Sequence, residues 1–171
     1  EGGVAALGVA SGAAAINYTF LNLASAGDNI VSAKTIYGGT YNLFNVTLRK
    51  LGIDFTFVSP SATEEELAAA IRPNTKAIFG ETISNPSLEI LDIEKFARVA
   101  HKAGVPLIVD ASQSAGILPI NMKSLGAAYI AMPGHKGLYG PQGTGVLLCG
   151  DGQIPRPLLE GGTGSISLSQ E

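Results

Sequence analysis

The sequence is poor in cysteine and in charge, and both shortages exclude classes of protein. Its single cysteine, Cys149, excludes an internal disulfide, which fits a reducing compartment. Charged residues make up only 15% of the chain and the net charge is −3, so nothing points to nucleic acid or to an anionic membrane. No apolar run is long enough to span a bilayer, and no signal peptide is recognisable. We therefore expect a cytoplasmic protein.

Glycine and apolar residues are abundant instead. The chain has 22 glycines and is 46% apolar over 171 residues, which is enough for one sizeable core and one domain with much buried surface. The first residue is Glu1 rather than methionine, and the last residues read "GSISLSQE". We expect both ends to be cuts through something larger.

The order of sequence patterns predicts a three-layer α/β fold around a mostly parallel sheet with one antiparallel strand. Short β-branched runs alternate with longer amphipathic or alanine-rich stretches, as in such folds. Only a short glycine-rich connection separates the last two strands, so we expect them to be antiparallel neighbours. One helix begins at "SATEEEL", where Ser61 or Thr63 can cap it. We expect strands near 29–33, 53–58, 75–80, 106–110, 127–132 and 145–149, and helices near 12–25, 39–51, 63–71 and 92–103.

Three polar or small-residue motifs lie where helices begin or strands end. In "ASGAAAIN", Ser11 and Gly12 open a helix, and free N–H groups beside small residues make an anion site; a plain N-cap is the alternative. Tyr37 in "TIYGGTYN" follows a strand, so its ring can face the crevice there, unless it packs in a turn. Asn85 in "ETISNPS" ends another strand and can face a ligand, with turn chemistry before Pro86 as the alternative.

The most specific signals are an acid and a lysine that follow two later strands. Asp110 in "LIVDASQSAG" ends a buried strand, with Gln113 three residues on, and an acid there is costly unless a cation pairs with it. A helix N-cap is the alternative. Lys136 in "PGHKGLYGPQGTG" faces the same crevice, and a lysine desolvated among glycines can act as a nucleophile toward an aldehyde. His135 and nearby amides can hold a phosphate.

Two other phosphate motifs do not fit the lysine loop. A P-loop needs Lys and Ser or Thr directly after its last glycine, which "GPQGTG" lacks. A dinucleotide fingerprint opens a helix, whereas this loop leads into a strand. A phosphate cup, a flat ring, an acid, polar groups and a lysine are together the features that bind pyridoxal 5'-phosphate. We therefore predict pyridoxal 5'-phosphate as the cofactor and no metal.

Two stretches of the sequence resemble two families of fold-type I pyridoxal-phosphate enzymes. Residues 1 to about 105 closely resemble the Cys/Met-metabolism enzymes, especially O-acetylhomoserine sulfhydrylases, in "EGGVAALGVASG", "AGDNIVSAKTIYGGTYNLF" and "ETISNP". Residues from about 106 to 171 resemble class V aminotransferases and cysteine desulfurases, in "VDASQSAGILPI", "PGHKGLYGPQGTG" and "LLEGGTGS". The mixture suggests a chimera joined near 101–110, at the segment "HKAGVPLIVD" that both families share.

The resemblance implies a role for each candidate residue. It makes Lys136 the lysine that holds the cofactor as a Schiff base, and Asp110 the partner of the pyridine nitrogen. It also implies a small amino acid as substrate and a homodimer. The other contacts that it implies are Tyr37 stacked on the ring, Gln113 and Asn85 at the ring hydroxyl, Ser11, Gly12, Ala13 and His135 at the phosphate, and Thr163 reaching the phosphate of a neighbouring subunit.

Some features depart from the families' patterns. Pro133 stands where the class V pattern has a phosphate-binding serine, which weakens the cup. The C-terminal domain that carries the arginine for the substrate carboxylate has no counterpart in this sequence. Cys149 ends a buried strand and is expected in the core, so persulfide chemistry is not expected.

Three hypotheses about function follow. In the first, residues 1–171 form a single pyridoxal-phosphate-binding core of a sulfur amino acid transferase or lyase, with weak or absent turnover in isolation, because the substrate is poorly positioned. In the second, the chain is an engineered or minimal α/β scaffold without activity. In the third, it is a fragment of an active sulfhydrylase or cysteine desulfurase.

Overall fold

The computed structural model describes residues 2–152 and Leu158, and its centre is a seven-stranded sheet in the order β1-β7-β6-β5-β4-β2-β3. β7 runs antiparallel to β1 and β6, and every other neighbouring pair is parallel. This confirms the predicted mostly parallel sheet and its antiparallel strand. The strands are β1 (Ala5–Val9), β2 (Asn29–Ala33), β3 (Asp54–Val58), β4 (Thr75–Glu81), β5 (Leu107–Asp110), β6 (Tyr129–Pro133) and β7 (Gly145–Cys149).

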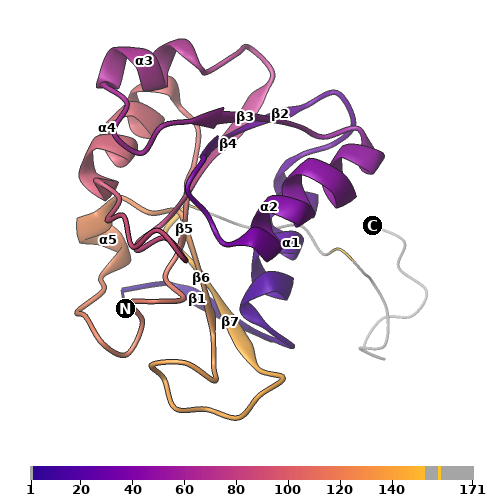
Figure 1. Ribbon diagram of the computed structural model, residues 1–171. Coiled ribbons are helices and arrows are strands. Elements are labelled where there is room, and N and C mark those ends of the chain that lie inside the picture. Colours follow the sequence, from indigo (N-terminus) through magenta and orange to yellow (C-terminus); the bar gives the residue numbers. More distant parts are fainter. Residues whose placement is uncertain (1, 153–157, 159–171) are drawn as a thin grey trace.

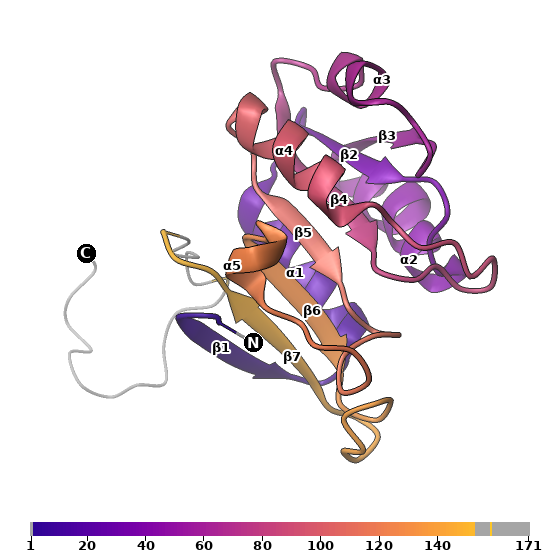
Figure 2. The same cartoon turned by 90° about the vertical axis from the view of Figure 1, so that its left-hand side faces the viewer.

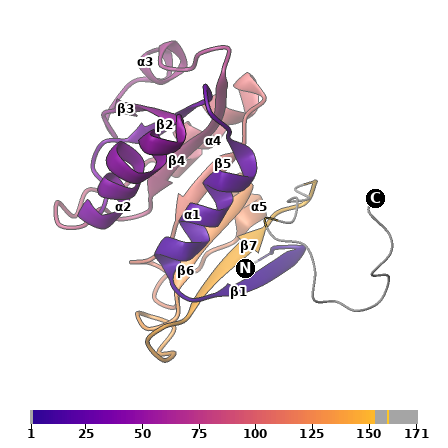
Figure 3. The ribbon, with the colours of Figure 1, turned by 90° about the vertical axis from the view of Figure 1, so that its right-hand side faces the viewer.

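Helices cover both faces of the sheet. Figure 1 shows α1 and α2 on one side of the strands and α3, α4 and α5 on the other, and Figures 2 and 3 show the two helical layers from either side. None of the described helices is both long and apolar enough to cross a membrane. The helices are α1 (Gly12–Leu23), α2 (Gly38–Asn42), α3 (Glu64–Ala69), α4 (Ile93–Ala103) and α5 (Met122–Leu125).

The elements that sequence patterns did not predict are short or irregular. β1 is an edge strand of sequence AALGV, in which only Val9 is β-branched, so its intrinsic strand preference is low. α5 is a single turn capped by Asn121, whose side chain accepts from the N–H groups of Lys123 and Ser124. The helix expected over 39–51 is broken into α2, a π-helical segment (Leu43–Thr47) and a 3₁₀ turn (Leu48–Leu51).

Four phenylalanines fasten one helical layer to the sheet. The rings of Phe44 and Phe55 stack with centroids 4.4 Å apart, and Phe20 meets Phe44 edge to face at 4.9 Å. Phe79 on β4 completes the cluster, and its ring centroid lies 5.0 Å from that of Phe44. Such ring pairs stabilise a core beyond their buried area. The cluster therefore fixes the π-helical segment and α1 against β3 and β4.

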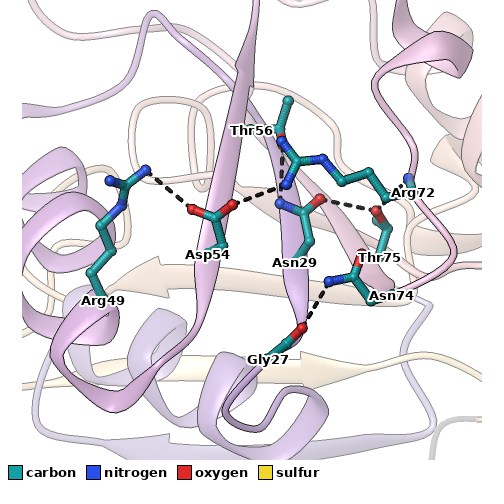
Figure 4. Close-up of polar contacts among 8 residues, drawn as sticks. All are labelled: Gly27, Asn29, Arg49, Asp54, Thr56, Arg72, Asn74 and Thr75. Atoms are coloured by element: carbon teal, nitrogen blue, oxygen red, sulfur yellow. Dashed lines mark hydrogen bonds and ion pairs between the residues drawn. The ribbon is translucent and has the colours of Figure 1, made fainter.

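A polar network fixes the beginnings of β2, β3 and β4 (Figure 4). Fully buried Asn29 donates to the hydroxyl of Thr56 at 3.0 Å and accepts from the hydroxyl of Thr75 at 2.9 Å. Asp54 lies between two arginines at the exposed end of the network. Because a one-residue slip would break these bonds, the network holds the register of all three strands. The opposite ends of the strands are thereby placed relative to one another.

Substituting Thr63 with alanine is expected to destabilise the fold by about 1 kcal/mol. Thr63 caps α3: its hydroxyl accepts from the N–H of Glu66 at 3.2 Å, and the Glu66 carboxylate accepts from the N–H of Thr63 at 2.9 Å. Urea unfolding measures the loss. Ser61→Ala is the matched control, since the exposed Ser61 hydroxyl bonds only to Ser59 and caps no helix. Equal losses in both variants would contradict the assignment of the cap to Thr63.

Candidate functional site

Two buried acids lie side by side at the carboxyl end of the sheet. Glu81 is the last residue of β4 and Asp110 the last of β5, and the two are register partners. They are only 6% and 4% exposed. Asp110 accepts a hydrogen bond from the backbone N–H of Ser112 at 2.8 Å, which is a turn contact rather than a helix cap. The alternative in which Asp110 caps a helix is therefore wrong.

The predicted ring contacts converge around these acids. The acid, the lysine, the ring-facing tyrosine and both polar side chains predicted for a cofactor ring all line one cavity. The cavity measures about 30 Å³, and the side chains of Tyr37 and Lys136 in its lining are exposed. Its lining is Tyr37, Glu81, Ile83, Asn85, Asp110, Ser112, Gln113 and Lys136.

The electrostatics of the site are dominated by burial. Burial, and then the charge of Asp110, raise the pKa of Glu81 from 4.5 to about 7. Burial also raises the pKa of Asp110, and the positive charge of Lys136 offsets part of both effects. Neither acid has a cation in direct contact. Within the described part of the chain, the ion pairs closer than 4 Å are Arg49–Asp54, Arg72–Asp54, Lys76–Asp28 and Arg98–Glu64.

The cofactor-free protein is expected to lose stability between pH 5 and pH 8 because of Glu81. Its folded-state pKa of about 7 lies above the ordinary 4.5, so the folded chain keeps a proton there that the unfolded chain has released. The resulting stability is fully present below about pH 4.5 and is lost as the pH rises through about 7, a change of roughly 3 kcal/mol in the free energy of unfolding. Asp110 acts in the same direction.

Urea unfolding at several pH values tests this expectation. Glu81→Gln should flatten the pH dependence relative to the unsubstituted chain, and the difference between the two curves isolates Glu81 from all other carboxyl groups. Glu89→Gln makes the same chemical change at an exposed position and should leave the curve as it is. Parallel curves for the unsubstituted chain and Glu81→Gln would show that Glu81 ionises normally in the folded state.

The loop that carries Lys136 is held against the segment after Asp110. The loop turns sharply, since the N–H of Tyr139 donates to the carbonyl of Lys136 at 2.9 Å. Gly116 and Gly137 let the two segments touch backbone to backbone, because a Cβ on either glycine would overlap the opposite backbone. Lys136 is therefore fixed relative to the segment that Asp110 begins.

The predicted phosphate cup lies beside the same loop. Ser11 caps α1, and its hydroxyl accepts from the N–H of Ala14 at 3.0 Å. Gly12 packs on the end of β6, where an added Cβ would lie 3.0 Å from the nitrogen of Pro133. Ala13 is exposed in the first turn. The start of the helix thus faces the loop three residues before Lys136, although Pro133 contributes neither an N–H nor a hydroxyl.

The remaining candidates have varied positions. His135 is exposed beside the lysine, and Thr163 lies outside the described residues. Cys149 is 3% exposed, which confirms that it belongs to the core. Glu81 was not predicted as a site residue. The signal was present, because Glu81 directly follows the apolar stretch "TKAIFG", just as Asp110 ends a buried strand.

The site fits the predicted cofactor in its donor and acceptor groups. Two adjacent buried acids without a cation in contact would be relieved by a protonated ring nitrogen. The start of the twelve-residue α1, with small residues, suits a phosphate. Among the described residues there is no cluster of histidine, cysteine and acids that could hold a metal ion.

Comparison with known families gives an independent result. The model of the family described as "Cys/Met metabolism PLP-dependent enzyme" matches residues 1–136, which is most of the chain. The chain belongs to the Cys/Met metabolism PLP-dependent enzymes. Pyridoxal 5'-phosphate is the cofactor of this family, which confirms the predicted cofactor. The match ends at Lys136 and includes the proposed join at 101–110.

Curated relatives of this Cys/Met metabolism chain include O-acetyl-L-homoserine sulfhydrylases and a homocysteine synthase. The chain is 53% identical to O-acetyl-L-homoserine sulfhydrylase of Corynebacterium glutamicum over 110 residues, which is 64% of this chain and 25% of that protein. It is 45% identical to O-acetyl-L-homoserine sulfhydrylase 1 of Thermus thermophilus over 130 residues, which is 76% of this chain and 31% of that protein. The matched regions thus span about a quarter to a third of the relatives' length.

Solved structures agree with this family assignment. A protein described as an O-acetylhomoserine (thiol)-lyase of Campylobacter jejuni, which carries an N'-pyridoxyl-lysine-5'-monophosphate, superposes with a TM-score of 0.81 at 35% identity, over 88% of this chain and 38% of its own. Cystathionine gamma-lyase of Lactobacillus plantarum, complexed with L-serine, superposes with a TM-score of 0.79 at 34% identity, over 86% of this chain and 39% of its own. These matches confirm the predicted fold class.

Proposed function

We propose that the chain is the pyridoxal-phosphate-binding core of a sulfur amino acid transferase or lyase of the O-acetylhomoserine sulfhydrylase type, with weak or absent turnover in isolation. The observation that carries the proposal is the convergence of Lys136 and the buried Asp110 on one cavity at the carboxyl ends of parallel strands. Ligands of open α/β sheets bind at this edge. Residues 1–171 are proposed to form one domain.

Each residue of the cavity has a task in this proposal. When bound, pyridoxal phosphate supplies an aldehyde for attachment and a ring that takes up the electrons of a breaking substrate bond. Nζ of Lys136 would hold the cofactor by its aldehyde and, when free, would move a proton at the substrate α-carbon as general base. The Asp110 carboxylate would be the partner of the ring nitrogen. Tyr37 would cover one face of the ring.

The other contacts orient the two ends of the cofactor. Gln113 and Asn85 line the same cavity and are proposed to face the ring hydroxyl. The phosphate is proposed to bind at Ser11, Gly12 and Ala13, with His135 beside them. The N–H of Ala14 donates to the Ser11 hydroxyl, so the N–H groups of Gly12 and Ala13, at the very start of the helix, are the ones proposed for the phosphate.

The substrate is proposed to be a small amino acid and the protein a cytoplasmic homodimer in which Thr163 reaches the phosphate of the neighbouring subunit. Several large apolar side chains around the site support an association of two copies. Exposed apolar patches of this kind associate. The side chains are Leu88, Ile90, Ile117, Leu118 and Tyr139, all more than half exposed.

Two finer proposals concern the chain's origin and its activity. The segment from about residue 106 is proposed to derive from a class V aminotransferase or cysteine desulfurase and to join the sulfhydrylase-like segment near 101–110, on the evidence of its motifs. The alternative function is an α/β scaffold without activity. The small volume of the cavity and Pro133 in the phosphate cup favour it.

Trapping the cofactor on the protein tests the proposed function. The purified protein is mixed with pyridoxal 5'-phosphate, reduced with borohydride and digested, and the pyridoxylated peptide is located by mass spectrometry. The proposal expects one adduct, on Lys136. Scatter over Lys34, Lys50, Lys76 and Lys102, or no adduct, would support the scaffold instead.

A further inference from the structure

Glu81 contacts the backbone of two loops that carry ring contacts. Its Oε1 accepts a hydrogen bond from the backbone N–H of Tyr37 at 2.8 Å, although 44 positions separate them in the sequence. A second backbone N–H, that of Asn85, acts on the same carboxylate and lowers its pKa. One buried side chain at the end of β4 therefore connects the loop after β2 with the loop after β4.

Each loop begins from an anchored residue, since Ile36 is 8% exposed in the core and the N–H of Thr82 donates to the carbonyl of Asp110 at 3.0 Å. Tyr37 precedes a helix of only five residues, and its side chain is 55% exposed. In the loop after β4, Ser84 bonds to Ser87 and to the backbone of Glu89, so these contacts stay within the loop. The bond from the N–H of Tyr37 to Glu81 ties the backbone of the loop after β2 to the end of β4, beside the site.

The location of Glu81 is costly for the fold alone. A carboxylate buried beside a second buried acid, with no cation in contact, is less stable than a neutral side chain of the same size. Groups held in such surroundings within a cavity concentrate at functional sites. Both oxygens of the carboxylate can accept from N–H donors, whereas glutamine has one oxygen and an NH₂ group that cannot accept.

We propose that Glu81 is a positioning residue of the cofactor site, whose carboxylate holds the backbone of Tyr37 and faces that of Asn85, so that both side chains meet the same ring. The proposal rests on the proposed function for the identity of the ligand. It assigns no contact with the cofactor to Glu81 itself. Glu81 acts through Tyr37, whose ring is proposed to stack on the cofactor, and through Asn85, whose side-chain amide is proposed to face the ring hydroxyl.

Amide hydrogen exchange of the cofactor-free protein, followed by NMR, tests the loop contacts directly. In Glu81→Gln, the amide of Tyr37, of Asn85 or of both should exchange at least about 10-fold faster, because the NH₂ group of glutamine replaces one carboxylate oxygen and cannot accept a hydrogen bond. The amide of Ser112, which bonds to Asp110, should keep its rate. Unchanged rates at Tyr37 and Asn85, or equal acceleration at all amides including Ser112, would overturn the proposal.

Binding of pyridoxal 5'-phosphate tests the consequence for the site. Glu81→Gln should bind it about 10-fold more weakly, whereas Glu89→Gln, on the exposed part of the same loop, should bind it normally. The reduced adduct should remain on Lys136 in both variants. Unchanged affinity in Glu81→Gln would overturn the positioning role.

The two measurements also separate this proposal from the proposed function. If the unsubstituted protein forms no adduct on Lys136, the proposed function fails. Selective acceleration at Tyr37 and Asn85 in Glu81→Gln would still support the contacts of Glu81, because the exchange experiment contains no cofactor.

Discussion

Replacing Lys136 with alanine is expected to abolish covalent capture of pyridoxal 5'-phosphate. Lys136 is the lysine that lines the cavity with Asp110 and Glu81, and its positive charge acts to lower the pKa of both acids. An aldehyde held at that cavity has no other amine within the lining. The reduced adduct, measured by mass spectrometry of the intact protein, should fall from stoichiometric to background.

The control for this substitution is Lys102→Ala, which removes an exposed lysine at the end of α4 and should leave the adduct unchanged. Lys136 is itself exposed, so its loss should change the free energy of unfolding by no more than about 0.5 kcal/mol. A full yield of adduct in Lys136→Ala would show that the attachment point is another lysine.

Replacing Asp110 with asparagine is expected to change affinity and stability in opposite directions. The asparagine oxygen can keep the hydrogen bond from the N–H of Ser112, so the turn survives. Without the carboxylate, a protonated ring nitrogen loses its buried partner, which costs about 2–5 kcal/mol and weakens binding about 30-fold or more. The cofactor-free fold should gain stability, because a buried acid of raised pKa has been removed.

Equilibrium titration with pyridoxal 5'-phosphate and urea unfolding of the cofactor-free protein measure the two effects. Asp151→Asn, at an exposed position, should change neither. A variant that loses stability and affinity together would indicate that Asp110 serves the fold. A variant with unchanged affinity would show that the ring nitrogen has another partner.

The elements that sequence patterns predicted well are those with a continuous apolar signal. β2 and β7 match their expected bounds, and Asp110 and Lys136, which were expected to face one crevice, line the same cavity. β1 was not predicted, because its alanine- and glycine-containing sequence has little strand preference and the strand forms through its pairing with β7. The π-helical segment was not predicted. The spacing of apolar residues does not distinguish a helix whose hydrogen bonds span four residues from one whose bonds span five.

Glu81 shows why part of the site is not readable from sequence. An acid that ends a strand looks like any polar boundary, and only the pairing of β4 with β5 places it beside Asp110. Its contact with Tyr37 also depends on β2 lying next to β4, a non-consecutive neighbour in the chain. The family resemblance of the first part of the chain is confirmed, whereas the class V origin of the later part stays a prediction.

The order of the strands also sets the order in which the site can assemble during synthesis. β1 pairs with β7, which follows it by more than a hundred residues, so β1 waits on the order of ten seconds at ribosomal rates. Ser11 and Gly12 pack against Gly145, at the start of that last strand. The lysine loop, which lies between β6 and β7, is therefore anchored at both ends only after β7 has left the ribosome. A nascent chain stalled before Gly145 should take up no cofactor, however long it waits.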